Sequence, residues 1–222
     1  MESNAPPRPA IVLCDYGQVL AGFDRSRCAE GFARLLGRPL PAEAAPLLED
    51  LLNPFESGAI DTATFLDTLR EPLGLRSEEE ELAFRKAWGS ILWALEEPIA
   101  LLRRVKQRPN TVVHVVTNTD PWRLAYASEE LGMADLFEEV SASFEDGVTP
   151  KGQDSSMWRT ARLRATATLG CEPELVLGID DLPANLAPAM TDGTLTHAHV
   201  FTAAPSLEQE LIALDLINPN RR

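Results

Sequence analysis

A chain of 222 residues is long enough for one well-buried core, or for a core that carries a smaller inserted unit. Hydrophobic residues make up 45% of the chain and charged residues 24%, which is typical of a globular protein and excludes a disordered one. The formal net charge of −14 disfavours partners such as nucleic acid and anionic membranes, and an anionic substrate would need local positive charge from a metal ion or a lysine.

The termini and the cysteines indicate a cytoplasmic protein. No apolar run approaches the roughly 20 residues that cross a bilayer, and the first ten residues lack the pattern of a signal peptide. Cys14, Cys28 and Cys171 lie far apart without metal-ligand spacing, so we expect reduced thiols. The sequence leaves the oligomeric state open.

Short apolar runs alternate with helical patterns along most of the chain. The runs predict buried strands at 10–14, 112–116, 175–179 and, more weakly, 197–201. Helical patterns lie at 98–106, 122–131, 157–169 and 184–190. This alternation predicts an α/β fold, a Rossmann-like parallel sheet with helices on both faces.

Residues 23–93 break the alternation. They contain helical apolar spacing, for example at Phe65, Leu66 and Leu69, and no convincing strand. We therefore expect a helical insertion after the first strand.

Polar residues follow three of the predicted strands. Asp15 ends the first strand, Thr117 and Asn118 end the second, and Asp180 and Asp181 end the third. In an open parallel sheet, ligands bind outside the carboxyl ends of the strands, so we expect these side chains to converge in one crevice.

The chemistry of this set is coherent. Three carboxylates with a neighbouring hydroxyl suit a hard cation such as Mg²⁺, and a hydroxyl at a strand-to-helix turn suits a phosphate oxygen. A carboxylate can also act as a nucleophile that forms an aspartyl-phosphate, and a lysine would offset the crowded negative charge.

The order of these motifs resembles the haloacid dehalogenase-like (HAD) superfamily. Residues 14–20 resemble its first motif, 116–119 its second, Lys151 its third and 180–185 its fourth. Residues 131–137 resemble the approach to the lysine, and residues 55–61 resemble part of the family's helical cap. The resemblance covers nearly the whole chain. Within the superfamily, the chain most resembles the helical-capped sugar-phosphatase branch, which includes glucose-1-phosphatases.

The resemblance implies a division into two domains. Residues 8–22 and 94–222 would form the HAD-like core, and residues 23–93 the helical cap. It also implies a hydrolase, a phosphatase that acts on a small phosphorylated metabolite, for example a sugar phosphate.

The resemblance further implies roles for single residues. Asp15 would attack phosphorus, and Lys151 would neutralise the nucleophile and the phosphate. Thr117 and Asn118 would hold the phosphoryl group as the substrate-binding residues.

A magnesium ion is the implied cofactor. Asp15, the backbone carbonyl of Gly17 and Asp180 would bind Mg²⁺, and Asp181 would support the site.

Two departures from the family pattern keep other functions open. Gly17 stands where many phosphatases of the superfamily have a second aspartate as general acid and base, and the usual lysine-proline order is reversed in Pro150-Lys151. One alternative is a haloacid dehalogenase, which needs no metal and usually lacks the paired aspartates seen at Asp180 and Asp181. Another is a catalytically impaired HAD-fold protein with a binding or regulatory function.

Overall fold

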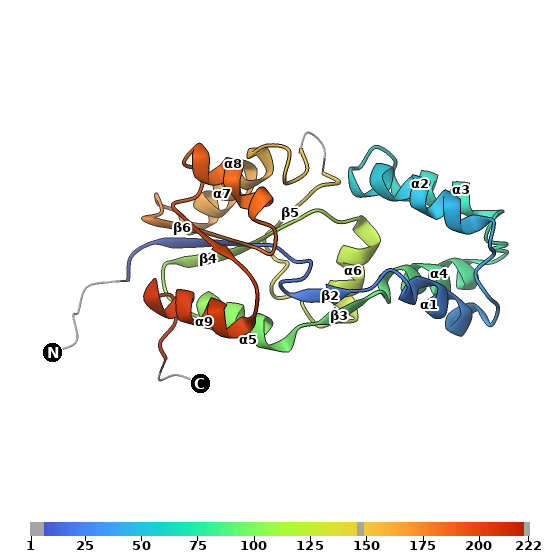
Figure 1. Cartoon of the computed structure of the whole chain (residues 1–222), viewed down its shortest axis with the longest axis horizontal. Helices are drawn as coiled ribbons and strands as arrows, with labels where there is room; N and C mark the ends of the chain where they lie inside the picture. Colours follow the sequence, from blue (N-terminus) through green and yellow to red (C-terminus); the bar gives the residue numbers. More distant parts are fainter. Residues whose placement is uncertain (1–6, 146–148, 220–222) are drawn as a thin grey trace.

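The centre of the fold is a parallel sheet (Figure 1). The computed structural model describes residues 7–145 and 149–219. Within these ranges the sheet has five strands in the order β5-β4-β1-β6-β7, all parallel. The strands are β1 (Ala10–Cys14), β4 (Thr111–Thr117), β5 (Val140–Ala142), β6 (Leu175–Asp180) and β7 (His197–Val200). The predicted parallel α/β sheet is thereby confirmed, with β5 as an additional strand.

Helices cover both faces of the sheet because the side chains of the strands alternate between the two faces. Val12 and Cys14 pack with α5 (Glu96–Lys106) and α9 (Ala204–Ala213) on one face, and Ile11 and Leu13 pack with α7 (Ser156–Leu169) and α8 (Pro183–Thr191) on the other (Figure 1). None of the helices in the described ranges is long and apolar enough to cross a membrane. The helices that flank the sheet are α5 (Glu96–Lys106), α6 (Pro121–Glu129), α7 (Ser156–Leu169), α8 (Pro183–Thr191) and α9 (Ala204–Ala213).

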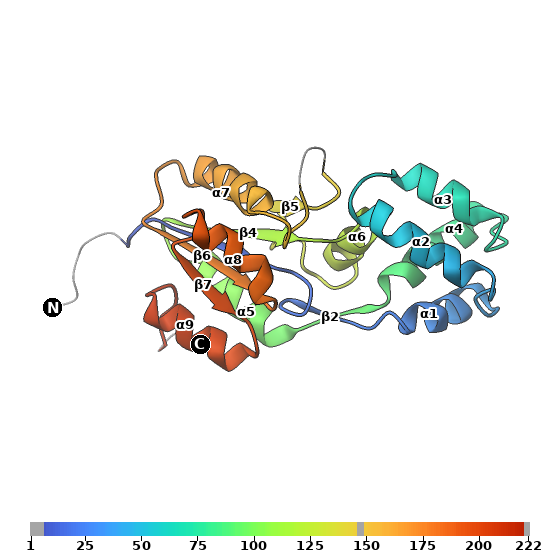
Figure 2. The same ribbon diagram turned by 45° about the horizontal axis from the view of Figure 1, so that its top comes forward.

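Four consecutive helices lie beside the sheet, away from its two covered faces (Figure 2). We call them the helical unit: α1 (Arg27–Leu36), α2 (Ala44–Glu56), α3 (Thr62–Arg70) and α4 (Glu78–Gly89). Side-chain caps fix the start of two of them, since the Asp61 carboxylate accepts from Thr64 N–H and the Ser77 hydroxyl accepts from Glu80 N–H.

Two short strands connect the helical unit to the sheet, and they correct the expectation that residues 23–93 contain no strand. These strands are β2 (Ala21–Phe23) and β3 (Leu92–Ala94), which pair antiparallel. Each has only three residues, and the two form a separate two-stranded sheet, so the sequence carries no strand-length apolar run to reveal them.

The helical unit has an apolar interior of its own, and one member of it comes from outside the unit. Trp122, in the first turn of α6, lies among the phenylalanines of the helical unit. Its ring makes edge contacts with Phe55, Phe65 and Phe84 at centroid distances of 5.5, 5.2 and 5.8 Å. The start of α6 is therefore packed against both parts of the fold.

A buried histidine in the sheet should make the fold sensitive to acid. His114 in β4 is fully buried, and its Nε2 lies 2.9 Å from the Ser141 hydroxyl. Burial lowers the pKa of His114 from 6.5 to about 4, although the nearby Glu139 opposes this shift. As the pH falls from 6.5 to 4, the unfolded chain takes up a proton that the folded protein excludes, so the free energy of unfolding decreases.

Replacing this residue in His114→Gln should remove that contribution. We expect the variant to lose about 3 kcal/mol less stability than the wild type between pH 7 and pH 4. Urea unfolding at several pH values measures the difference. Parallel pH profiles of the two proteins would contradict the assignment.

Candidate active site

The carboxyl ends of the three central strands bring the predicted site residues together. In β1, Cys14 pairs with Val115 of β4 and with Ile179 of β6. Asp15 and Asp180 are the next residues along their strands, and Asp15 N–H donates to the Ile179 carbonyl at 2.8 Å. The two carboxylates therefore lie side by side at one edge of the sheet.

Lys151 joins these two carboxylates. Its Nζ lies 2.6 Å from Asp15 Oδ1 and 2.7 Å from Asp180 Oδ2, and all three side chains are buried. The residue comes from the segment before α7, and the reversed Pro150-Lys151 order still delivers the ammonium group to the cluster. This geometry is what a nucleophilic aspartate with a neutralising lysine requires.

The side chain of Asn118 holds the Lys151 backbone. Asn118 Oδ1 accepts from Lys151 N–H at 2.9 Å, and Asn118 Nδ2 donates to the Lys151 carbonyl at 3.3 Å. The structure thus gives this amide a partner other than the expected phosphoryl group. Its visible role is to position the lysine loop against the end of β4.

The carboxylate of Asp180 is fixed in orientation by donors on the side away from the lysine. Its Oδ1 accepts from Leu182 N–H at 2.9 Å and from Asn185 Nδ2 at 2.8 Å. Asn185 is therefore a structural hydrogen-bonding residue, and Asp180 Oδ2 is directed toward Lys151.

Asp15 Oδ1 is held in a similar way. It accepts from Tyr16 N–H at 2.6 Å in addition to its contact with the lysine. Two donors on one oxygen fix the rotamer of this carboxylate and leave the other oxygen for chemistry.

The cluster carries more negative than positive charge. One ligand oxygen from each of Asp15, Asp180 and Asp181 can be chosen so that all three lie within 4.8 Å of one another. Burial raises the pKa of Asp15 to about 6, with Lys151 opposing and Asp180 adding to the shift, and burial together with Asp180 raises the pKa of Asp181. Burial opposes the charge on Lys151, but the adjacent carboxylates outweigh it and raise the pKa of the ammonium.

One lysine cannot neutralise three carboxylates. Oxygen ligands at this spacing suit a hard divalent cation, which would offset both the burial of these carboxylates and the repulsion between them. The residues present therefore fit the expected Mg²⁺.

The remaining predicted residues lie around this cluster. Thr117 is buried at the end of β4, and its carbonyl accepts from Ser143 N–H at 3.0 Å. Gly17 lies on the loop after Asp15, and a Cβ added there would meet only the Phe23 ring, at 3.9 Å.

A cavity opens beside Gly17, toward the helical unit. It has a volume of about 130 Å³. Among the residues that line it are Asn118 and three charged residues to which the sequence analysis gave no role of their own, namely Arg25, Glu56 and Arg123. These three belong to separate segments of the chain, so no local motif could have assembled them.

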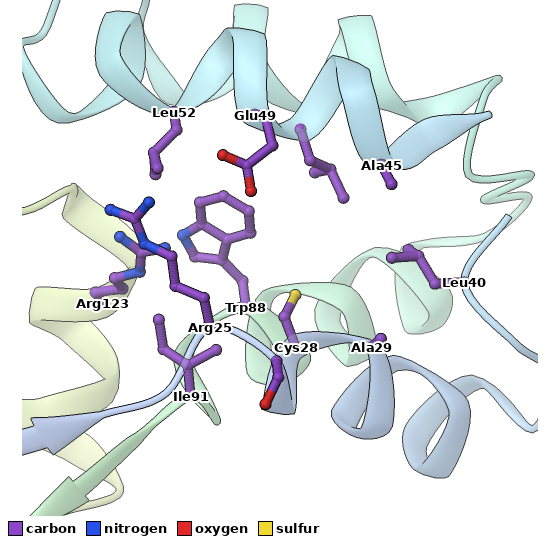
Figure 3. A pocket seen from close by; sticks show the side chains of 12 residues that line it. Arg25, Cys28, Ala29, Leu40, Ala45, Glu49, Leu52, Trp88, Ile91 and Arg123 are labelled. Atoms are coloured by element: carbon purple, nitrogen blue, oxygen red, sulfur yellow. The ribbon is translucent and has the colours of Figure 1, made fainter. Parts of the chain in front are cut away.

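A second cavity, of about 150 Å³, lies between helices of the helical unit and the start of α6 (Figure 3). Apolar side chains such as Leu48 and Leu52 form much of its wall. Arg25 and Arg123 line both cavities, and Figure 3 shows them at the same end of this second one.

Comparison with solved structures shows which fold this is, whereas no protein-family model and no curated protein matches the chain. A predicted HAD-like family hydrolase from Porphyromonas gingivalis is similar with a TM-score of 0.65 and 21% identity, over 92% of this chain and 98% of that one. A HAD family enzyme from Bacteroides thetaiotaomicron, in complex with magnesium and inorganic phosphate, is similar with a TM-score of 0.61 and 24% identity, over 88% and 95% of the two chains. The chain has the HAD fold. A HAD family hydrolase from Deinococcus radiodurans R1 with bound phosphate and sodium shares the HAD fold at a TM-score of 0.52 and 18% identity, over 94% and 97%.

Proposed function

We propose that the protein is a Mg²⁺-dependent phosphatase that acts on a small phosphorylated metabolite, for example a sugar phosphate, through an aspartyl-phosphate at Asp15. The observation that carries this proposal is the buried Lys151 ammonium between Asp15 and Asp180, with Asp181 completing a carboxylate cluster that needs a cation. The magnesium and phosphate in a structure of the same fold support it.

Each residue has a role in the proposed reaction. Asp15 attacks phosphorus, and the bond to the leaving oxygen breaks as the aspartyl-phosphate forms; water then releases inorganic phosphate and restores the carboxylate. Lys151 balances charge on Asp15 and on the incoming phosphoryl group, and Asn118 keeps the lysine loop in place. When bound by Asp15, Asp180, Asp181 and the Gly17 carbonyl, Mg²⁺ would neutralise phosphoryl oxygens.

We propose that residues 23–93 act as a cap over this site, on the core formed by residues 8–22 and 94–222. Contacts between the end of α2 and the core support this: Glu56 pairs with Arg123 of α6 at 2.6 Å, and the hydroxyl of Ser143, which follows β5, donates to the Glu56 carbonyl at 2.5 Å. Closure over a substrate would exclude bulk water while Asp15 attacks phosphorus.

A metal-dependent assay tests the function. The purified protein is freed of metal by a chelator and assayed on phosphorylated metabolites and on p-nitrophenyl phosphate, with and without added Mg²⁺. We expect phosphate release that needs Mg²⁺. Halide release from 2-haloacids without metal would establish the dehalogenase alternative. Calorimetric Mg²⁺ binding without any turnover would instead establish the binding-protein alternative.

Gly17 makes a prediction about leaving groups. Negative charge builds on the leaving oxygen in phosphoryl transfer, and a general acid that protonates it is worth about 10²–10⁴-fold. Glycine has no proton to give, so aryl and anomeric sugar phosphates should react much faster than alkyl phosphates. Equal rates for both classes, with chemistry rate-limiting, would show that another residue supplies the proton.

The matched variant is Gly17→Asp. The backbone at Gly17 does not have a positive φ, and the added Cβ has space, so the side chain fits locally. We expect the variant to accelerate alkyl phosphates more than aryl phosphates, and Gly17→Asn to have no such selectivity. Steady-state kinetics on the two substrate classes gives the comparison.

A further inference from the structure

We propose that the cavity beside Gly17 binds a second anionic group of the substrate, and that Arg25 is the residue that recognises it. The inference rests on the proposed phosphatase function and narrows its substrate class to small phosphate esters that carry a carboxylate or a second phosphate. The chain has a net charge of −14, so a doubly anionic substrate needs positive charge at both of its ends. The Lys151 cluster serves one end, and the cavity has guanidinium groups for the other.

Of the two guanidinium groups, that of Arg123 is already balanced. Arg123 is buried, pairs with Glu56 at 2.6 Å, and has its Nε 3.4 Å from Asp120. It also lies over the Trp88 ring, at 4.6 Å from the centroid. These contacts hold the Arg123 side chain in place at the edge of the cavity, and the two carboxylates balance its charge.

Arg25 differs because its charge is only partly balanced, by a longer-range attraction to Glu56 in the same cavity. Among the described residues, Arg25 forms no ion pair within 4.0 Å, and it is exposed. The neighbouring Asp24 carboxylate accepts from Ser26 N–H at 2.9 Å and from the Ser26 hydroxyl at 2.7 Å, so it is turned into its own loop. Of the two guanidinium groups that line this cavity, that of Arg25 is therefore the less neutralised.

The position of the cavity connects this cation to the phosphoryl site. Gly17 and Asn118, which flank the Asp15 and Lys151 cluster, line the same cavity as Arg25. A volume of about 130 Å³ leaves room for only a short spacer between the two anionic groups. A guanidinium matches the geometry of both carboxylate and phosphate, so both sources of charge are to be tested.

Kinetics on matched substrates tests the inference. Carboxymethyl phosphate and 1,2-ethanediol bisphosphate are each compared with ethyl phosphate in the wild type, in Arg25→Gln and in the control Arg27→Gln. The Arg27→Gln substitution removes the same charge two residues away from Arg25. The Arg27 side chain lies over the Trp93 ring and does not line the cavity. We expect Arg25→Gln to reduce the ratio of kcat/KM for each substrate with a second anionic group to kcat/KM for ethyl phosphate by about tenfold or more. The control should keep the wild-type ratio.

The two substrates with a second anionic group show whether Arg25 recognises a carboxylate or a phosphate. The group that Arg25 recognises better is the one whose kcat/KM, relative to ethyl phosphate, falls more in Arg25→Gln. An unchanged ratio for both in Arg25→Gln would overturn the inference. Calorimetry on Asp15→Asn protein with the same three compounds separates this result from a failure of the phosphatase proposal. If a compound with a second anionic group binds more tightly than ethyl phosphate, and the Arg25→Gln substitution removes this difference, the subsite is supported even if no phosphate ester is hydrolysed. Equal binding of all three compounds would remove the subsite.

Discussion

Replacing Asp15 with asparagine should abolish turnover and leave the protein folded. The substitution keeps the size of the side chain and its contact with Tyr16 N–H, but it removes the charge that attacks phosphorus. Loss of a residue that forms the covalent bond costs about 10⁴-fold or more in kcat. Removing one of several crowded carboxylates should not destabilise the fold, because Asp180 still pairs with Lys151.

Initial rates and thermal unfolding of Asp15→Asn test both parts of this expectation. The control is Asp67→Asn, which changes an exposed carboxylate on α3 and should keep full activity. In the wild type, acid-quenched mass spectrometry during turnover should find one added phosphoryl group, on the peptide that contains Asp15. A folded Asp15→Asn protein with normal activity would eliminate Asp15 as the nucleophile.

Replacing Lys151 with methionine should have two separate effects, one on activity and one on stability. Activity should be lost because the phosphoryl group and Asp15 lose their neutralising partner. Stability should fall by about 3–5 kcal/mol in the presence of a chelator, because breaking a buried ion pair leaves uncompensated charge. Mg²⁺ should restore much of this stability, since it would bind the carboxylates of the folded state and not the unfolded chain.

Chemical unfolding of Lys151→Met in chelator and in Mg²⁺ measures these effects. Lys106→Met is the matched control: Lys106 pairs with the exposed Glu138 at 2.5 Å, and its loss should cost less than about 1 kcal/mol with no dependence on Mg²⁺. If the Lys151→Met protein is as stable as the wild type in chelator, the ion pairs of Lys151 with Asp15 and Asp180 do not contribute to stability as expected.

Much of the sheet could be predicted from the sequence because its central strands are buried on both faces. Strands of this kind are continuous apolar runs, as in Ala10–Cys14 and Leu175–Asp180, and no solvent-facing residue interrupts them. The edge strand Val140–Ala142 has only three residues, one of them a serine, so no periodic signal marks it.

The site could be predicted in part, for a similar reason. Asp15 directly follows β1, and Asp180 is the last residue of β6. Because these two strands pair, their register alone brings the two carboxylates together. Lys151 reaches them from a loop, and its place depends on the Asn118 amide, which no pattern reveals. Arg25 and Arg123 line the same cavities because the segment before α1 lies near α6, and packing between separate segments has no local signature.

The position of Trp122 bears on how such proteins could be recombined. A chimera that transfers only the helical unit to another sheet would lack the Trp122 ring. A cavity would then remain where this ring packs against Phe55, Phe65 and Phe84. The chimera would also leave behind Asp120, whose carboxylate accepts a hydrogen bond from the Trp88 indole at 3.0 Å. The unit of exchange is therefore discontinuous, and a graft has to carry the first turn of α6 together with the four helices.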